Sequence, residues 1–269
     1  MDTSTILAQL HNAFNLSSDV VLSHHPSGAV NHVYRLQDKA QHIDYAVKWL
    51  GDDNFSGVNR THQFVLQQQL CQVDIAPKPI WLSDDERIWV EYWHPNTRLA
   101  QRNPETLANV LARIHQLPVT ARPLNLAARW QHYLHVASLS EGDALYDRAT
   151  ALRSAVLRSE QVDEDLVLCH NDLLYSHILC REGNTPVVID WEYSAMGNRY
   201  FDLASCCLIN ELDDATSNKL VSCYADILSL SHGEAKEKFS LHKDIVSTTN
   251  ALWFEALSES TPNKLLAEI

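Results

Sequence analysis

Two short apolar segments, each followed by an aspartate, constrain this chain more than any other feature. The first, Leu166 to Leu168, leads into a polar loop that carries His170 and Asp172. The second, Val187 to Ile189, ends on Asp190. Because short apolar runs bounded by turn residues are typical of buried strands, we expect two strands joined by loops, with a carboxylate after each.

Two carboxylates placed in this way suit phosphoryl transfer. One carboxylate positions the attacking hydroxyl and accepts its proton, while another holds the magnesium that neutralises the phosphates. We assign Asp172 to the first role and Asp190 to the second. A lone loop aspartate is more often only solvated, but the pair, together with His170 ahead of Asp172, favours a catalytic site.

The same segment resembles the aminoglycoside phosphotransferase and choline kinase superfamily. The resemblance rests on H-N-D at 170–172, I-D-W-E-Y at 189–193 and D-L-A at 202–204. The W-E-Y form is most similar to choline, ethanolamine and thiamine kinases. The resemblance implies an α+β, bilobal protein-kinase-like fold, with an N-terminal lobe of antiparallel sheet and helix and a larger, mainly helical C-terminal lobe. It also implies that ATP and Mg²⁺ take part in the reaction.

Composition narrows the classes of partner. A formal net charge of −13 lacks the basic footprint of nucleic-acid binders, so we expect no nucleic-acid partner and favour a cationic substrate. The six cysteines form no C-x-x-C pair, which indicates reduced thiols in a cytoplasmic protein. The sequence offers neither a signal peptide nor a span long enough to cross a membrane, so we expect no membrane partner. The oligomeric state stays open.

Hydrophobic periodicity predicts a strand-rich first part and a helix-rich second part. We place the boundary after residue 93, with a nucleotide-binding lobe at 1–93 and a catalytic and substrate-binding lobe at 94–269. The expected strands are 20–23, 30–36, 43–50 and a hairpin within 79–93. The expected helices are 5–14, 59–72, one from Pro104, 128–139, 143–158, 201–209, 213–230 and 244–258.

The first lobe carries candidate nucleotide contacts. Gly28 either makes only a tight turn or covers phosphates with backbone N–H groups. The resemblance favours the second reading, since choline-kinase-like proteins carry a similar G-x-x-N-x-x-Y segment, here Gly28, Asn31 and Tyr34. Strand alternation puts Ala46 and Lys48 on one face, where a small residue leaves room for a purine and a lysine supplies a cation for its phosphates.

Further nucleotide-lobe residues follow from the resemblance alone. The family's helix after the lysine strand supplies a glutamate that pairs with the lysine, and here Gln63 stands at that place. A glutamine offers no charge, so we expect Lys48 to be held less firmly. Family hinge backbone groups bind adenine, which makes Glu91 to Trp93 candidates through their backbone. In the second lobe, His115 is expected from the same resemblance to support the loop that carries His170 and Asp172.

The second metal ligand departs from the family pattern. The family places an asparagine five residues after the catalytic aspartate, and His177 stands there. Magnesium prefers oxygen ligands, whereas imidazole suits manganese and other transition metals. Three alternatives remain: His177 binds metal and shifts preference towards Mn²⁺, it points away while water takes its place, or phosphoryl transfer has been lost.

Substrate contacts are expected around the second aspartate and in the C-terminal helices. Aromatic faces and carboxylates hold quaternary ammonium groups, and the candidates are Trp191, Glu192, Glu211 and Trp253. For Trp253, ordinary core packing is the commoner role. We expect an ATP-dependent kinase of a small cationic alcohol of the choline, ethanolamine or thiamine type. The alternatives are an aminoglycoside-type antibiotic kinase and a nucleotide-binding protein with impaired catalysis, the latter motivated by Gln63 and His177.

Overall fold

The computed structural model describes residues 3–25, 32–51, 56–94, 98–180 and 185–260. They divide into two compact units, and each is described by itself. The first unit comprises the described residues of 1–53, 59–98 and 180–189, and the second those of 54–58, 99–179 and 190–269.

An antiparallel sheet with the strand order β1-β2-β3-β5-β4 forms the centre of the first unit. Its strands are β1 (Val21–His25), β2 (His32–Asp38), β3 (Ile43–Trp49), β4 (Pro79–Leu82) and β5 (Ile88–Tyr92). The unit also contains the helices α1 (Thr3–Ala13) and α2 (Arg60–Gln72) and the short strand β9 (Val187–Val188). Strands β1, β2 and β3 pair in the order of the sequence and correspond to the strands expected at 20–23, 30–36 and 43–50.

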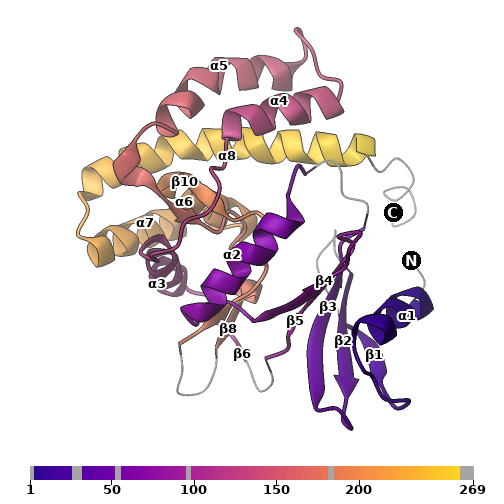
Figure 1. Cartoon of the computed structure of the whole chain (residues 1–269). Coiled ribbons are helices and arrows are strands. Elements are labelled where there is room, and N and C mark those ends of the chain that lie inside the picture. The colour runs from indigo at the N-terminus through magenta and orange to yellow at the C-terminus, as the bar shows by residue number, and fades with distance from the viewer. Residues whose placement is uncertain (1–2, 26–31, 52–55, 95–97, 181–184, 261–269) are drawn as a thin grey trace. The chain divides into compact units, whose positions relative to one another are not determined.

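Alternation along β3 and β5 gives the sheet two different faces. One face carries Val47 and Val90, which pack with Ile6 and Leu10 of α1 into a core that excludes water. Helix α1 accordingly lies beside the sheet (Figure 1). Full burial of each such aliphatic side chain contributes about 2 kcal/mol. The opposite face carries Ala46 and Lys48 of β3 with Trp89 and Glu91 of β5.

Helices make up most of the second unit. They are α3 (Pro104–His115), α4 (Leu126–Val136), α5 (Ala144–Ser159), α6 (Arg199–Ile209), α7 (Asp214–Leu228) and α8 (His232–Ser260). Helix α8, drawn in yellow, runs beside α4 and α5 (Figure 1). The segment between α5 and α6 contains several short elements. They are η1 (Asp163–Asp165), β7 (Leu166–Cys169), η2 (Tyr175–His177), β8 (Ile178–Cys180) and β10 (Ala195–Asn198). Strand β6 (Arg98–Leu99) lies where the units divide.

Local sequence signals account for several helix starts. Asn103 caps α3 by accepting a hydrogen bond from the Thr106 backbone N–H at 2.8 Å, and Pro104 follows at the first helical position. Asp213 caps α7 in the same way, with the Thr216 N–H at 2.7 Å. Both helices therefore begin within a residue of the place that their capping residues predict.

The main differences from the sequence-based expectation are β10 and α8, and the short strands β6 and β8 were also not predicted. Strand β10 was not predicted, and it pairs antiparallel with β7, with Ala195 opposite Cys169. Helix α8 begins at His232 rather than at residue 244. Its first turns bury only Ala235 and Phe239, so the apolar period there is sparse and the segment resembles a polar loop.

Among the residues that the structure describes, no helix combines the length and apolar character needed to cross a membrane.

Candidate active site

The two predicted aspartates lie close together in the second unit, with His177 between them. Asp172 follows β7 and Asp190 follows β9, while His177 closes the short helix η2. One ligand atom of each of these three residues lies within 4.8 Å of the others. The sequence placed Asp172 and Asp190 at strand ends 18 positions apart, and the fold brings them to one site.

Asp172 sits in an environment that disfavours its charged form. Burial first, and then the negative charges of Asp190, Glu192 and Asp202, raise the pKa of Asp172 from 3.8 to about 8. Without a cation beside it, the group is mostly protonated at neutral pH, and its ionised form has a high proton affinity. Such a pKa suits a general base, because the proton affinity is then matched to the working pH.

His177 is oriented by the backbone of the catalytic loop. Its Nδ1 lies 2.9 Å from the carbonyl oxygen of Asp172, and since a carbonyl only accepts, Nδ1 carries the proton. Its Nε2 faces the Asp190 Oδ2, 3.6 Å away. Either a proton on Nε2 or a cation bound by both atoms would make this contact favourable. Metal-binding histidines are commonly held by such a hydrogen bond from the other ring nitrogen.

The donor set therefore fits a divalent cation. Carboxylate oxygens from Asp172 and Asp190 are ligands that Mg²⁺ and Mn²⁺ accept, and the imidazole of His177 adds a donor that favours Mn²⁺. Asp190 also has a positive φ of 70°, a backbone region that non-glycine residues rarely adopt and that clusters at functional sites.

Helix α6 fixes the catalytic loop through a buried carboxylate. Asp202 accepts hydrogen bonds from the backbone N–H groups of His170 at 2.7 Å and Asn171 at 2.8 Å. Burial alone would raise the pKa of Asp202, but its hydrogen bond with His115 and the charges of His115 and His170 lower it below the ordinary value. These contacts brace the loop that carries His170 and Asp172.

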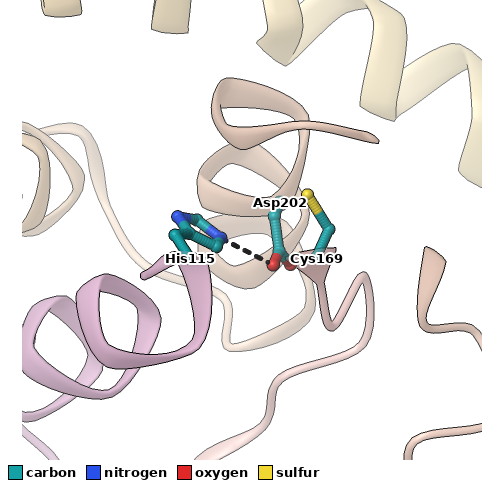
Figure 2. Close-up of side chains that lie close together, drawn as sticks. All are labelled: His115, Cys169 and Asp202. Atoms are coloured by element: carbon teal, nitrogen blue, oxygen red, sulfur yellow. Dashed lines mark hydrogen bonds and ion pairs between the residues drawn. The ribbon is translucent and has the colours of Figure 1, made fainter. Parts of the chain in front are cut away.

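His115 extends this contact into α3 and α7. Its Nε2 lies 3.0 Å from Asp202 Oδ2 and its Nδ1 lies 2.6 Å from the hydroxyl of Tyr224. Figure 2 shows His115 and Asp202 facing each other, with Cys169 beside the carboxylate. These three buried side chains have the composition of a metal site. However, hydrogen bonds occupy both His115 nitrogens, and burial together with Asp202 raises the pKa of Cys169, which keeps the thiol protonated. We therefore interpret the group as a hydrogen-bonded support.

Two further supporting residues, Ser205 of α6 and Asn210 directly after it, were missed from the sequence. Ser205 donates to the Asn171 carbonyl at 2.8 Å. Asn210 donates to the Leu173 carbonyl at 2.8 Å and accepts from the Tyr175 N–H at 3.0 Å. The available signal was the presence of polar residues at 202, 205 and 210 in a largely apolar segment, at a spacing that a helical period puts towards one face.

His170 and Trp191 support the loop from its buried side. His170 is fully buried, and its ring lies 4.8 Å from that of Trp191. Trp191 is only 2% exposed, so its predicted contact with a substrate cation would require the ring to become uncovered.

The other predicted substrate residues differ in their exposure. Glu192 is half-buried and is close enough to Asp172 to raise its pKa. Glu211 is exposed just beyond the end of α6. Trp253 is half-buried in α8, with its ring edge-on to Phe254 at 5.0 Å.

Predicted nucleotide contacts fall in the first unit. Gly28 and Asn31 lie outside the described residues. Ala46 and Lys48 share a face of β3, and the Lys48 side chain is 12% exposed. Gln63 is half-buried on α2. The Glu91 side chain, which was not singled out from the sequence, lies beside Lys48.

The predicted hinge already uses part of its backbone within the sheet. The N–H of Trp93 donates to the Asp44 carbonyl at 3.1 Å, and the N–H of Tyr92 donates to the Lys78 carbonyl at 2.8 Å. The guanidinium of Arg35 covers the Trp93 ring at 4.8 Å. Adenine binding through the Trp93 N–H would therefore have to displace an existing hydrogen bond.

Relatives and solved structures match over most of the chain. The LicA homolog of Mycoplasma capricolum subsp. capricolum is 27% identical over 217 residues, which cover 80% of this chain and 85% of that protein. The choline kinase LicA of Streptococcus pneumoniae superposes with a TM-score of 0.74 at 20% identity, covering 96% of this chain and 91% of that one. For a Plasmodium vivax ethanolamine kinase the TM-score is 0.72 at 17% identity, with coverage of 94% and 81%.

These likenesses confirm the fold class that the sequence predicted: an N-terminal antiparallel sheet followed by a mainly helical remainder, as in kinases of known structure. Residues 21–227 match the sequence profile of the Phosphotransferase enzyme family. The match covers more than half of the chain, and the expected superfamily is thereby confirmed. The chain belongs to the Phosphotransferase enzyme family and is a phosphotransferase.

Proposed function

We propose that this phosphotransferase moves the γ-phosphate of ATP to the hydroxyl of a small cationic alcohol, with choline as the first candidate and ethanolamine and thiamine as the next. The observation that carries the proposal is the gathering of Asp172, His177 and Asp190 at one site in a chain of this family. The names of the relatives, which include choline and ethanolamine kinases, support the choice of acceptor.

Asp172 is the general base in this proposal. The acceptor hydroxyl gives its proton to the Asp172 carboxylate while its oxygen bonds to the γ-phosphorus, and the bond from that phosphorus to the β-phosphate oxygen breaks to release ADP. The raised pKa gives the ionised form of Asp172 a high proton affinity, and a bound cation would lower this pKa so that more of the carboxyl is ionised near neutral pH. Asp202 holds the backbone at His170 and Asn171, which fixes the position of the base.

Asp190 and His177 are the proposed ligands of Mg²⁺ or Mn²⁺, which, when bound, neutralises charge on the phosphates. The orientation of His177 by the Asp172 carbonyl supports this role. It favours the first of the three alternatives, in which His177 binds metal and shifts the preference towards Mn²⁺.

The two units carry different parts of the proposed function. Lys48, Ala46 and the segment around Gly28 serve the nucleotide, in the lobe that we place at 1–93. A LicA structure in complex with AMP, with a TM-score of 0.72, supports nucleotide binding. The lobe at 94–269 serves catalysis and the acceptor. Glu192 and Glu211 supply negative charge for an ammonium group, and Trp253 supplies an aromatic face.

A substrate panel tests the proposal. ADP release is followed with Mg·ATP and with Mn·ATP, using choline, ethanolamine, thiamine and kanamycin as acceptors. Turnover with one of the first three acceptors is the expected result. Turnover with kanamycin alone would make the chain an antibiotic kinase. If none of the acceptors supports turnover although the protein binds ATP, the result would indicate a nucleotide-binding protein with impaired catalysis.

A further inference from the structure

Lys48 has an acidic neighbour on an adjacent strand. Its Nζ lies 3.5 Å from Oε1 of Glu91, and the two side chains are only 12% and 3% exposed. In the antiparallel pairing of β3 with β5, Ala46 stands opposite Glu91 and Lys48 opposite Trp89. Lys48 and Glu91 are therefore diagonal neighbours on one face of the sheet, within reach of long side chains.

The other oxygen of Glu91 is held by two donors. Oε2 accepts from Nε2 of Gln67 at 2.8 Å and from Nε1 of Trp89 at 3.0 Å. Gln67 itself is 2% exposed, and its Nε2 also lies 3.1 Å from the Pro77 carbonyl oxygen. Burying a carboxylate is costly unless it is hydrogen-bonded and paired, and Glu91 meets both conditions. Its Oε1 is thereby left directed towards Lys48.

Gln67 comes from α2, the helix on which a glutamate was expected. Gln67 lies one helical turn after Gln63, on the same side of the helix. Through Gln67 the helix contributes an amide that orients the carboxylate, while the carboxylate itself comes from β5. The charge that Gln63 lacks is thus present beside Lys48.

We propose that Glu91 is the positioning residue for Lys48: its carboxylate, clamped by Gln67 and Trp89, holds the ammonium group in place for the nucleotide phosphates. This inference rests on the proposed function, in which Lys48 contacts those phosphates. The carboxylate of Glu91 on β5 takes the place of the helix glutamate that the family has. Lys48 therefore has a charged partner although Gln63 is uncharged. The positioning then depends on the register of β3 with β5, which lies within a single sheet.

A double-mutant cycle tests the proposal in the full-length chain. The variants are Glu91→Gln, Lys48→Gln and the two combined. The measurements are Mg·ATP affinity by calorimetry, and kcat and KM for ATP with the acceptor that the substrate panel identifies. We expect Lys48→Gln to lower kcat/KM for ATP at least about 100-fold and Glu91→Gln to lower it about 10-fold. The double variant should be no worse than Lys48→Gln, because residues acting as one unit are not additive.

Glu86→Gln is a matched control. It makes the same substitution in the same unit, and its carboxylate also contacts α2, through the Thr61 hydroxyl. We expect less than a twofold change in kcat/KM. If Glu91→Gln fails to fold, the cycle is run with Trp89→Phe, which removes one donor to the carboxylate. We then expect a smaller loss, about 3-fold, that again disappears in the Lys48→Gln background.

The outcomes separate this inference from the proposed function. Additive losses for Glu91 and Lys48, or an unchanged kcat/KM in folded Glu91→Gln, overturn the positioning role. An unchanged Mg·ATP affinity and kcat/KM in Lys48→Gln would instead overturn the phosphate contact, and with it the proposed function of the first unit.

Discussion

Replacing Asp172 with asparagine should stabilise the protein while removing its activity. The pKa of Asp172 is raised from 3.8 to about 8, mainly by burial. The folded state therefore keeps a proton that the unfolded chain loses as pH rises above 3.8. As pH rises from the pKa of the unfolded chain to that of the folded state, the carboxyl of Asp172 therefore lowers the free energy of unfolding progressively. Asparagine has no ionisable group and does not have this effect.

The size of the effect follows from the same shift. Each pH unit between 3.8 and 7 costs about 1.4 kcal/mol, which gives a ceiling of roughly 4 kcal/mol at pH 7. Because Asp172 is only half-buried and water relaxes around it, we expect about 1 to 3 kcal/mol. Groups that serve an enzyme's activity commonly lower the stability of the folded protein.

The assay is urea unfolding of the wild type and Asp172→Asn at several pH values from 4 to 8, with EDTA present so that no cation lowers the pKa of Asp172. The stability difference should be near zero at pH 4 and grow towards pH 8. Asp84→Asn, which changes an exposed carboxylate, should change the free energy of unfolding by less than about 0.5 kcal/mol. A difference that is independent of pH, or a less stable Asp172→Asn, would refute the reasoning.

Three further predictions concern the site and its supports. His177→Asn replaces an imidazole by an oxygen donor, so it should lower the ratio of Mn²⁺-supported to Mg²⁺-supported turnover at least about threefold. An unchanged ratio, together with an unchanged Mn²⁺ affinity, would contradict metal binding by His177. Asn210→Ala should lower the free energy of unfolding by about 2 kcal/mol in urea, since it leaves the Tyr175 N–H and the Leu173 carbonyl without this partner. Asp202 has a lowered pKa, so the stability it contributes is present above pH 3.8 and is lost as pH falls through its folded pKa. Asp202→Asn should therefore be less stable than the wild type at pH 6, with the gap narrowing on acidification; a gap that stays constant would argue against the assigned charge.

The grouping of Asp172 and Asp190 could be predicted from the sequence because its signals are local. Asp172 and Asp190 each follow a short apolar run in the sequence. Such runs predict strands, and a side chain that follows a strand lies near the end of that strand. Capping residues such as Asn103 and Asp213 likewise act within one turn of their helices.

The supports of the site depend on long-range contacts and could not be predicted. The place of Glu91 beside Lys48 follows from the register of two strands that are some 40 residues apart, and the clamp needs Gln67 from a third element. Strand β10 forms only because β7 offers it a partner. Its A-M-G-N sequence has weak strand propensity on its own.

Formation of phosphocholine is the most direct test of the central claim, that Asp172 serves as the base in phosphoryl transfer to a cationic alcohol. The wild type and Asp172→Asn are incubated with Mg·ATP and choline, and the products are followed by phosphorus NMR. The account predicts a phosphomonoester signal and ADP with the wild type, and neither with Asp172→Asn, although the variant still binds ATP. Equal product formation by the folded variant would contradict the account.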